Sequence, residues 1–259
     1  MTFTTIGFSG PAGSGKDLVA DYFAEKGFMK ISFADPIKRF VMKAFGIPKG
    51  VLWGPSAARD LEFRVEDYWW FEAIGHFNNA AQELLVDVLT DDTRHTGFLQ
   101  LYDWFTWLRF NHRERLSARV ILQTLGTEWG RKVDENIWLN YAYKNIEYCN
   151  VKGYRYIQDE GPTFLRQHYI GAVITDHRFK NEIVYTRKHG GYALRLIRAS
   201  QENKEGNVGL AGHKSEAEQK AIPDSDFDLV VRFEEGLDKV KDKLDQIYKE
   251  EAWKERAHS

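Results

Sequence analysis

The sequence has only one cysteine, Cys149, among its 259 residues, so no disulfide can form within the chain. A chain without disulfides is typical of a reducing compartment, which predicts a cytoplasmic protein. No apolar run approaches the ~20 residues that a membrane-spanning helix needs. The N-terminal residues also lack the basic segment and the apolar stretch of a signal peptide, so none is expected.

Positive charge and metal-binding clusters are scarce as well. The chain carries 36 lysines and arginines against 38 acidic residues, which argues against nucleic acid or a membrane surface as a partner. Its 8 histidines form no H-E-x-x-H motif and no Cys/His cluster, so no zinc site is expected and Cys149 is interpreted as structural. The 43% of hydrophobic residues suffices for a packed core, and the length suits a single domain over residues 1–259 that carries an insertion.

A glycine-rich motif near the N-terminus is the strongest functional signal. Residues 10–16 read GPAGSGK and match the G-x-x-x-x-G-K pattern of a phosphate-binding loop, with a strand expected before it at 4–9 and a helix after it at 17–26. In such a loop, backbone N–H groups and the helix N-terminus surround an anion, and the lysine bridges the β- and γ-phosphates of a nucleotide. The predicted nucleotide-phosphate site consists of Gly10, Ala12, Gly13, Ser14, Gly15, Lys16 and Asp17.

Asp17 stands where most of these loops carry serine or threonine, whose hydroxyl binds Mg²⁺ directly. Its carboxylate has two interpretations. It could hold the metal ion through water, or it could stabilise the first turn of the helix, where acidic residues are favoured. The sequence leaves both open.

Short apolar segments that alternate with helical patterns predict the rest of the fold. Strands are expected at 4–9, 28–33, 169–175, 192–198 and 227–233. This order indicates a three-layer α/β domain, with a five-stranded parallel sheet and helices on both faces. Other segments expected from the pattern are a turn at 34–38, helices at 37–45 and 117–126, a helical aromatic-rich insertion at 46–115, a polar loop or hairpin at 150–168, a lid loop at 199–214 and an amphipathic helix from 234.

A second candidate site follows the apolar strand at 169–175, in the run TDHRFKNE. Ligands of open parallel sheets bind at the carboxyl ends of the strands, so Asp176 could hold a hydrated Mg²⁺ ion and Arg178 could bind a phosphate. In the alternative interpretation, Asp176 caps the next helix and Arg178 pairs with Glu182, four residues on.

Weaker candidates lie in three other segments. Asp35 could meet a sugar or a base and Lys38 or Arg39 a phosphate, although Asp-Pro is also a common turn. Arg119 and Gln123 share one helix face and could present a cation and an amide, with Arg131 nearby, or could form a solvated face. Cations around the lid loop could close over phosphates or be ordinary surface charge: Arg195, Arg198, His213 and Lys214.

Five stretches together resemble the deoxynucleoside monophosphate kinases of tailed bacteriophages, which belong to the nucleoside-monophosphate-kinase branch of phosphate-loop folds. The stretches are FSGPAGSGKDLVADYF, FADPIK, LQTLGTEWGRKVDENIWLNYA, TDHRFKNEI and HKSEAE. That family also carries G-K-D in its phosphate loop. The resemblance covers about two thirds of the chain and is poor across 46–115 and 150–168.

The resemblance implies a kinase that transfers the γ-phosphate of ATP to a deoxynucleoside 5′-monophosphate for DNA precursor synthesis, with Mg²⁺ as cofactor. It implies the cytoplasm of an infected bacterium as the location if a phage encodes the chain. The implied catalytic residues are Lys16, Arg178 and Arg198, and the implied metal-binding residues, acting through water, are Asp17 and Asp176. The implied acceptor pocket consists of Asp35, Lys38, Arg119, Gln123, Arg131, Asp176 and Arg178.

Two other functions stay open at this stage. A phosphate-loop kinase could act on another small acceptor, such as a sugar or a coenzyme precursor. A nucleotide-dependent switch or assembly ATPase would use the same loop without an acceptor. The sequence does not decide base preference, the discrimination of deoxyribose from ribose, the role of the insertion or the oligomeric state, a homodimer included.

Overall fold

The computed structural model describes residues 3–11, 13–198 and 214–233. Three expectations therefore fall wholly or largely outside the described residues: Ala12 of the phosphate loop, residues 199–213 of the lid loop with His213, and the amphipathic helix from Glu234. No helix within the described ranges is long and apolar enough to cross a membrane.

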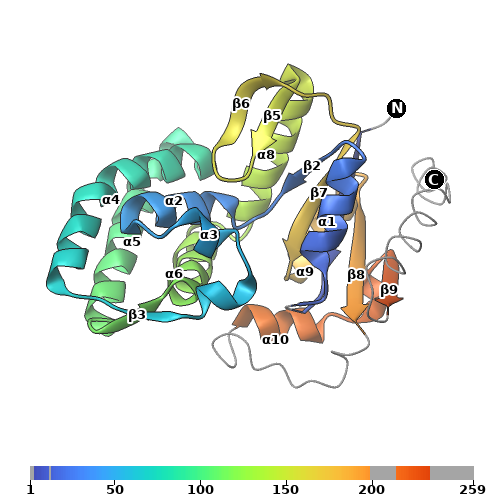
Figure 1. The fold of residues 1–259 in the computed structure, drawn as a ribbon. Helices are drawn as coiled ribbons and strands as arrows, with labels where there is room; N and C mark the ends of the chain where they lie inside the picture. Colours follow the sequence, from blue (N-terminus) through green and yellow to red (C-terminus); the bar gives the residue numbers. More distant parts are fainter. Residues whose placement is uncertain (1–2, 12, 199–213, 234–259) are drawn as a thin grey trace.

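A five-stranded parallel sheet forms the centre of the molecule, as predicted, in the order β2-β7-β1-β8-β9. Strands β7 and β8 point toward the lower part of Figure 1, where α10 lies, and because all five strands are parallel their carboxyl ends share one edge of the sheet. The strand bounds are β1 Thr4–Ser9, β2 Phe28–Ile31, β7 Gly171–His177, β8 Tyr192–Arg198 and β9 Leu229–Phe233.

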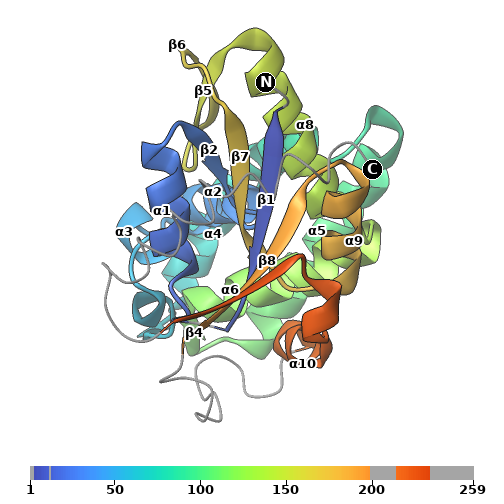
Figure 2. The ribbon, with the colours of Figure 1, turned by 90° about the vertical axis from the view of Figure 1, so that its right-hand side faces the viewer.

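Helices cover both faces of this sheet, as predicted (Figure 2). On one face, α1 (Lys16–Glu25) buries Val19 and Phe23 against apolar side chains of β1, β7 and β8. On the other face, the strands pack against α8 (Ile137–Lys152) and α9 (Lys180–Lys188). Because side chains alternate along each strand, both faces are apolar, which is the usual condition of a central parallel sheet.

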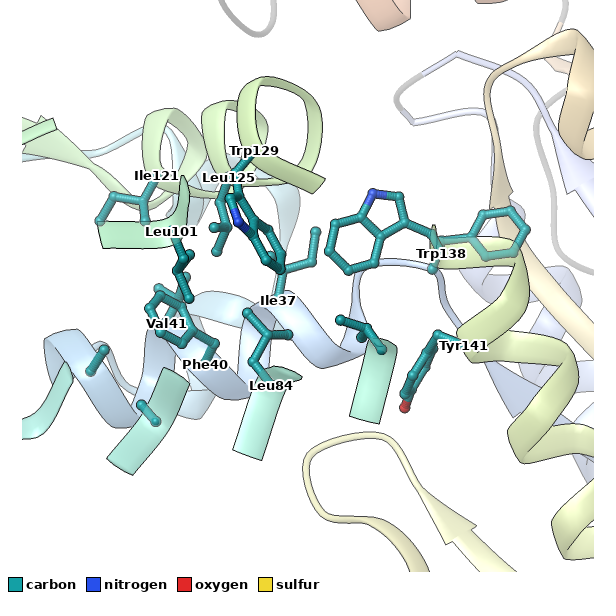
Figure 3. Close-up of a cluster of buried hydrophobic side chains, with 14 of the residues drawn as sticks. Ile37, Phe40, Val41, Leu84, Leu101, Ile121, Leu125, Trp129, Trp138 and Tyr141 are labelled. Carbon is teal, nitrogen blue, oxygen red and sulfur yellow. The ribbon is translucent and has the colours of Figure 1, made fainter. Parts of the chain in front are cut away.

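A helical region lies beside the sheet and shares its larger core with it (Figure 1). It contains α2 (Asp35–Phe45), α4 (Asp67–Val88), α5 (Asp91–Asn111) and α6 (Ala118–Thr124). Figure 3 shows the centre of this core, where labelled side chains from these helices and from α8 converge around α2. Two of the tryptophans of segment 46–115, Trp70 and Trp104, are buried here against Phe45.

Segment 46–115 also contains short elements that the sequence did not indicate. They are α3 Lys49–Leu52, the 3₁₀ turn η1 Ser56–Arg59, and β3 Glu62–Arg64, which pairs antiparallel with β4 Arg115–Ser117. Together they lead the chain from α2 to the long α4–α5 pair and back to α6. Trp53, just after α3, donates to Asp35 at the start of α2, so this stretch lies close to the carboxyl end of β2.

The predicted helix at 117–126 is shorter than expected and changes type. The Ser117 hydroxyl caps α6, and the chain then continues as a π-helix, η2 (Leu125–Gly130), and the short α7 (Arg131–Val133). The indole N–H of Trp138 donates to the carbonyl oxygen of Gly126 (3.0 Å), which fixes the wider turn. Single π turns of this kind are frequent at functional sites.

The remaining elements are a β-hairpin that follows α8 and two short helical segments between β8 and β9. Residues 150–168, expected as a loop or hairpin, form the end of α8 and a hairpin of β5 (Tyr154–Ile157) and β6 (Gly161–Arg166). After the lid segment come α10 (Lys214–Ala221) and the 3₁₀ turn η4 (Asp224–Asp226). The Gln219 amide of α10 donates to the carbonyl oxygen of His177 (3.0 Å), so this helix is attached to the end of β7.

Candidate nucleotide-binding site

The phosphate loop connects β1 to α1 at the carboxyl edge of the sheet. Gly13 and Gly15 have φ angles of 77° and 85°, which L-residues rarely adopt. Gly10 has φ 143°, and a Cβ there would lie 2.3 Å from the carbonyl oxygen of Leu196. Helix α1 begins without a side-chain cap, so its first-turn N–H groups are free of an intramolecular cap. The loop therefore fits the phosphates of a nucleotide.

Lys16 bends over this loop. Its ammonium donates to the carbonyl oxygens of Gly10 (2.6 Å) and Pro11 (2.8 Å). Burial and, to a smaller extent, Arg178 lower the pKa of Lys16, while Asp17 and Asp176 oppose the shift, and the resulting pKa is about 8. These electrostatic partners show that the phosphate loop and the end of β7 face each other.

The carboxylate of Asp176 holds the turn between β2 and α2. It accepts hydrogen bonds from the Ser32 hydroxyl (2.8 Å) and from the backbone N–H groups of Phe33 (2.9 Å) and Ala34 (3.3 Å). The interpretation of Asp176 as a helix cap is wrong, because the N-cap of α9 is Phe179. Asp176 instead connects the strands on either side of the candidate site.

Glu182 fixes the backbone around Arg178. Its carboxylate accepts from the N–H groups of Arg178 (2.6 Å) and Phe179 (3.0 Å), and its cationic neighbour is Arg131 (3.4 Å). The side-chain pair between Arg178 and Glu182 that the alternative interpretation proposed does not form, since only the backbone N–H of Arg178 makes the contact. In the parts of the chain that the structure describes, no carboxylate pairs with the Arg178 guanidinium, which stays available for an anion.

Glu182 should make the stability of the protein depend on pH. Burial raises its pKa from 4.5 to about 7, so between these values the folded state binds more protons than the unfolded state. The stabilisation is complete below pH ~4.5 and is lost as pH rises through ~7. Glu182→Gln should flatten this slope, measured as the urea midpoint from pH 4.5 to 7.5. The exposed Glu147→Gln serves as control, and an unchanged slope in Glu182→Gln contradicts the prediction.

Asp35 differs from its predicted role. It is the first residue of α2 rather than part of a turn, and its side chain is fully buried. Its carboxylate accepts from the Ser32 N–H (2.9 Å), the Trp53 indole (3.1 Å) and the Tyr156 hydroxyl (3.0 Å). Because the side chain is fully buried, Asp35 in this conformation supports the turn between β2 and α2 and is not placed to contact an acceptor.

Lys38 lies one turn along α2 and has Asp176 and Asp17 of the candidate site among its electrostatic neighbours. Its ammonium sits 5.4 Å from the centre of the Trp53 ring. Burial lowers the pKa of Lys38, Asp35 opposes this shift, and Arg59 adds a like charge. Arg39, by contrast, points into the core, where its guanidinium donates to Asp87 (2.8 Å) and to the Tyr141 hydroxyl (2.8 Å). Of the two cations considered for a phosphate, the structure brings only Lys38 to the site.

The acceptor-binding residues predicted on and after α6 have different surroundings. Arg119 binds the carboxylate of Asp60 and the Ser56 hydroxyl (2.8 Å). The amide of Gln123 is buried, and neither its nitrogen nor its oxygen has a hydrogen-bond partner among the described residues. The Arg131 guanidinium stacks over the Phe179 ring (3.7 Å) beside Glu182, so it supports the segment that follows β7.

The two arginines of β8 also have different surroundings. Arg195 donates to the carbonyl oxygen of Ile222 (2.6 Å) and pairs with Asp224 (3.0 Å). Its guanidinium is therefore used in structural contacts. Arg198 ends the strand at the carboxyl edge, and its buried Nε has no hydrogen-bond partner within the described chain. Nothing is described of the Lys214 side chain.

The site also fits a magnesium ion that arrives with a nucleotide. Asp17 is exposed in the first turn of α1, and both oxygens of Asp176 already accept hydrogen bonds, which suits contact through water better than direct ligation. Within the described ranges, no group of three or more histidine, cysteine or acidic side chains is placed to hold a metal ion. Any ion bound here would need nucleotide oxygens as ligands.

Sequence reasoning missed two residues of this site, Trp53 and Arg59. Both come from segment 46–115, where the motifs that guided the prediction are absent. Arg59 is an electrostatic neighbour of Asp17, Arg119 and Arg178. The hydrogen bond of Trp53 to Asp35 attaches this stretch to α2, and the ion pair of Arg119 with Asp60 attaches it to α6.

Comparison with known proteins gives one similarity across most of the chain. The sequence is 26% identical over 230 residues to a protein of Acanthamoeba polyphaga mimivirus named "Putative deoxynucleotide monophosphate kinase". The aligned region spans 87% of this chain and 86% of that protein. No protein-family model matches the chain.

Proposed function

We propose that this protein is an ATP-dependent kinase that phosphorylates deoxynucleoside 5′-monophosphates to diphosphates for DNA precursor synthesis. The observation that carries the proposal is that a phosphate loop and Arg178, whose guanidinium pairs with no carboxylate of the described residues, lie at the same sheet edge. Lys16 lies in the loop, and Arg178 faces it from the end of β7. The printed name of the mimiviral relative agrees with this function.

The reaction needs alignment and charge neutralisation rather than a covalent intermediate. An oxygen of the acceptor phosphate attacks the γ-phosphorus of ATP, the bond to the β–γ bridging oxygen breaks, and ADP leaves with that electron pair. Lys16 neutralises the β- and γ-phosphates while Arg178 orients the acceptor phosphate. Mg²⁺, held through water by Asp17 and Asp176, would add positive charge between the phosphates.

The acceptor lies, in this proposal, between α2, α6 and the end of β7. Lys38 and Arg119 supply cations on one side, and Arg198 approaches from β8. The buried and unpartnered amide of Gln123 supports a role in hydrogen bonding to a base, because leaving both of its polar atoms unsatisfied is costly. Asp35 and Arg131 position the walls of this pocket.

The test is an assay of ADP release with ATP, Mg²⁺ and each common deoxynucleoside and ribonucleoside monophosphate, with chromatography of the products. Formation of a diphosphate from a deoxynucleoside monophosphate supports the proposal. ADP release without any phosphorylated acceptor identifies a switch or assembly ATPase instead. Transfer only to a sugar or coenzyme precursor identifies a kinase of another class.

Arg178→Ala should affect the acceptor more than ATP. A charge-assisted hydrogen bond to phosphate contributes about 1.5–3 kcal/mol, so the acceptor KM should rise by about 10- to 100-fold. The KM for ATP should change by less than about threefold, because Lys16 and the loop amides remain. Steady-state kinetics with each substrate varied measures the two effects. The half-exposed Arg187→Ala on α9 is the control, and unchanged acceptor kinetics in Arg178→Ala contradict the assignment.

A further inference from the structure

Arg59 is held in a fixed position at the end of η1. Its Nη1 donates to the carbonyl oxygens of Leu52 (2.9 Å) and Gly54 (3.2 Å), which lie in the turn just before it. The side chain is half-buried, and within the described chain no carboxylate forms an ion pair with it. A guanidinium carries five N–H donors, so these two carbonyl contacts leave most of its donor capacity for another partner.

The segment that carries Arg59 is attached to the site at two points. Arg119 reaches across from α6 and binds the carboxylate of Asp60 and the hydroxyl and carbonyl oxygens of Ser56. On the other side, the indole of Trp53 donates to Asp35 (3.1 Å). Because Arg119 occupies the Asp60 carboxylate, the acid adjacent in sequence does not neutralise Arg59.

The charges around Arg59 place it near both the phosphate loop and the end of β7. Its electrostatic neighbours are Arg119, Arg178, Asp17 and Asp60. Burial lowers the pKa of Arg59, and the nearby guanidinium groups add to this shift. Three guanidinium groups, those of Arg59, Arg119 and Arg178, thus gather around two carboxylates, and a bound polyanion relieves the repulsion left among the arginines.

We propose that Arg59 binds a phosphate group at the boundary between the nucleotide in the loop and the acceptor, so that segment 46–115 supplies one cation of the transfer site. This inference rests on the proposed function and adds a residue to it. During transfer, charge spreads over the oxygens of the γ-phosphoryl group while its bond to ADP breaks and its bond to the acceptor oxygen forms. A guanidinium at this boundary can bind two of these oxygens at once.

Kinetics of two variants test this role. Arg59→Ala should lower kcat by about 10²-fold or more, because charge stabilisation in the transition state is lost. Arg59→Lys should recover only part of it, since lysine keeps the charge but lacks the planar fork. The control is Arg64→Ala in the same segment, where the side chain is 83% exposed, and it should stay within about twofold of the parent protein. An Arg59→Ala protein with parental kcat overturns the inference.

Calorimetric binding of inorganic tripolyphosphate separates this inference from the proposed function. Arg59→Ala should weaken tripolyphosphate binding by about 10-fold or more, whichever acceptor the enzyme uses. If no monophosphate is phosphorylated but this loss is seen, the proposed function fails and the phosphate-binding role of Arg59 stands. Unchanged tripolyphosphate affinity in Arg59→Ala, or no binding by the parent protein, overturns the inference. The melting temperature should fall by no more than about 2 °C, because a larger fall with retained binding indicates a purely structural role.

Discussion

Replacing Lys16 with alanine is expected to lower kcat/KM for phosphoryl transfer by about 10³-fold or more while the protein still folds. The reason is that, in the proposed function, the ammonium belongs to the loop that surrounds the β- and γ-phosphates, and no other lysine lies in residues 10–16. Its hydrogen bonds in the structure go to the loop itself, to Gly10 and Pro11. Losing them should cost little of the folding free energy. ADP-release kinetics and thermal melts measure the two quantities.

The pH profile of the parent protein gives a second readout for Lys16. Its pKa is lowered to about 8, so the charged form is present below this pH and is lost above it. Because kcat/KM reports groups of the free enzyme, it should decline above pH ~8 in the parent protein. Lys16→Ala should lack that decline. The matched control is Lys43→Ala, a surface lysine paired with Glu83, which should retain both the rate and the profile. Activity of Lys16→Ala within tenfold of the parent protein contradicts the role assigned to this lysine.

The central sheet and the phosphate loop could be predicted because their signals are local. Residues 10–16 carry the glycines and the lysine of the loop, and the apolar strands read as strands without any knowledge of their partners. The parallel topology then brings the end of β7 to the loop, since the carboxyl ends of parallel strands share one edge. Lys16, Asp176 and Arg178 meet for this reason.

The remaining parts of the site depend on contacts between distant segments, which no local pattern reveals. Asp35 was expected to face a ligand, but Trp53, Tyr156 and Gln158 converge on it and bury it. Arg59 stands in a stretch with no motif, and its place near Asp17 of the loop follows from tertiary contacts such as the ion pair of Arg119 with Asp60. The same limit applies to the π turn after α6, because its apolar spacing continues that of the helix before it.

A contact inside the sheet controls whether the site residues of β7 are held in place. His177, between Asp176 and Arg178, is fully buried, and its ring packs 5.1 Å from that of Phe33. Its Nε2 lies 2.8 Å from the Thr186 hydroxyl of α9. Burial lowers the pKa of His177 to about 3, so the ring is neutral and its role is packing. The space for this ring exists because the neighbouring strand β1 has Gly7 there.

Gly7→Ala is therefore expected to destabilise the protein by about 3 kcal/mol, at the upper end of overpacking costs. A Cβ at Gly7 would lie 2.1 Å from Cε1 of His177, and the buried ring cannot move aside without displacing Phe33 or breaking its contact with Thr186. The melting temperature should fall by roughly 6–12 °C. Gly75→Ala is the matched control, because Gly75 lies on the exposed face of α4 with nothing within 4 Å of its added methyl, and it should be neutral or stabilising by up to about 1 kcal/mol.

A double-mutant cycle identifies the contact responsible. His177→Ala alone should also destabilise the protein, since it leaves a cavity that the Gly7→Ala methyl partly fills. The combined variant should therefore lose less stability than the sum of the single changes, with a coupling of at least about 1 kcal/mol. Because His177 lies between Asp176 and Arg178, Gly7→Ala alone should also raise the acceptor KM, although Gly7 touches no substrate. Additive stabilities together with an unchanged KM would show that the ring does not transmit strain from β1 to the end of β7.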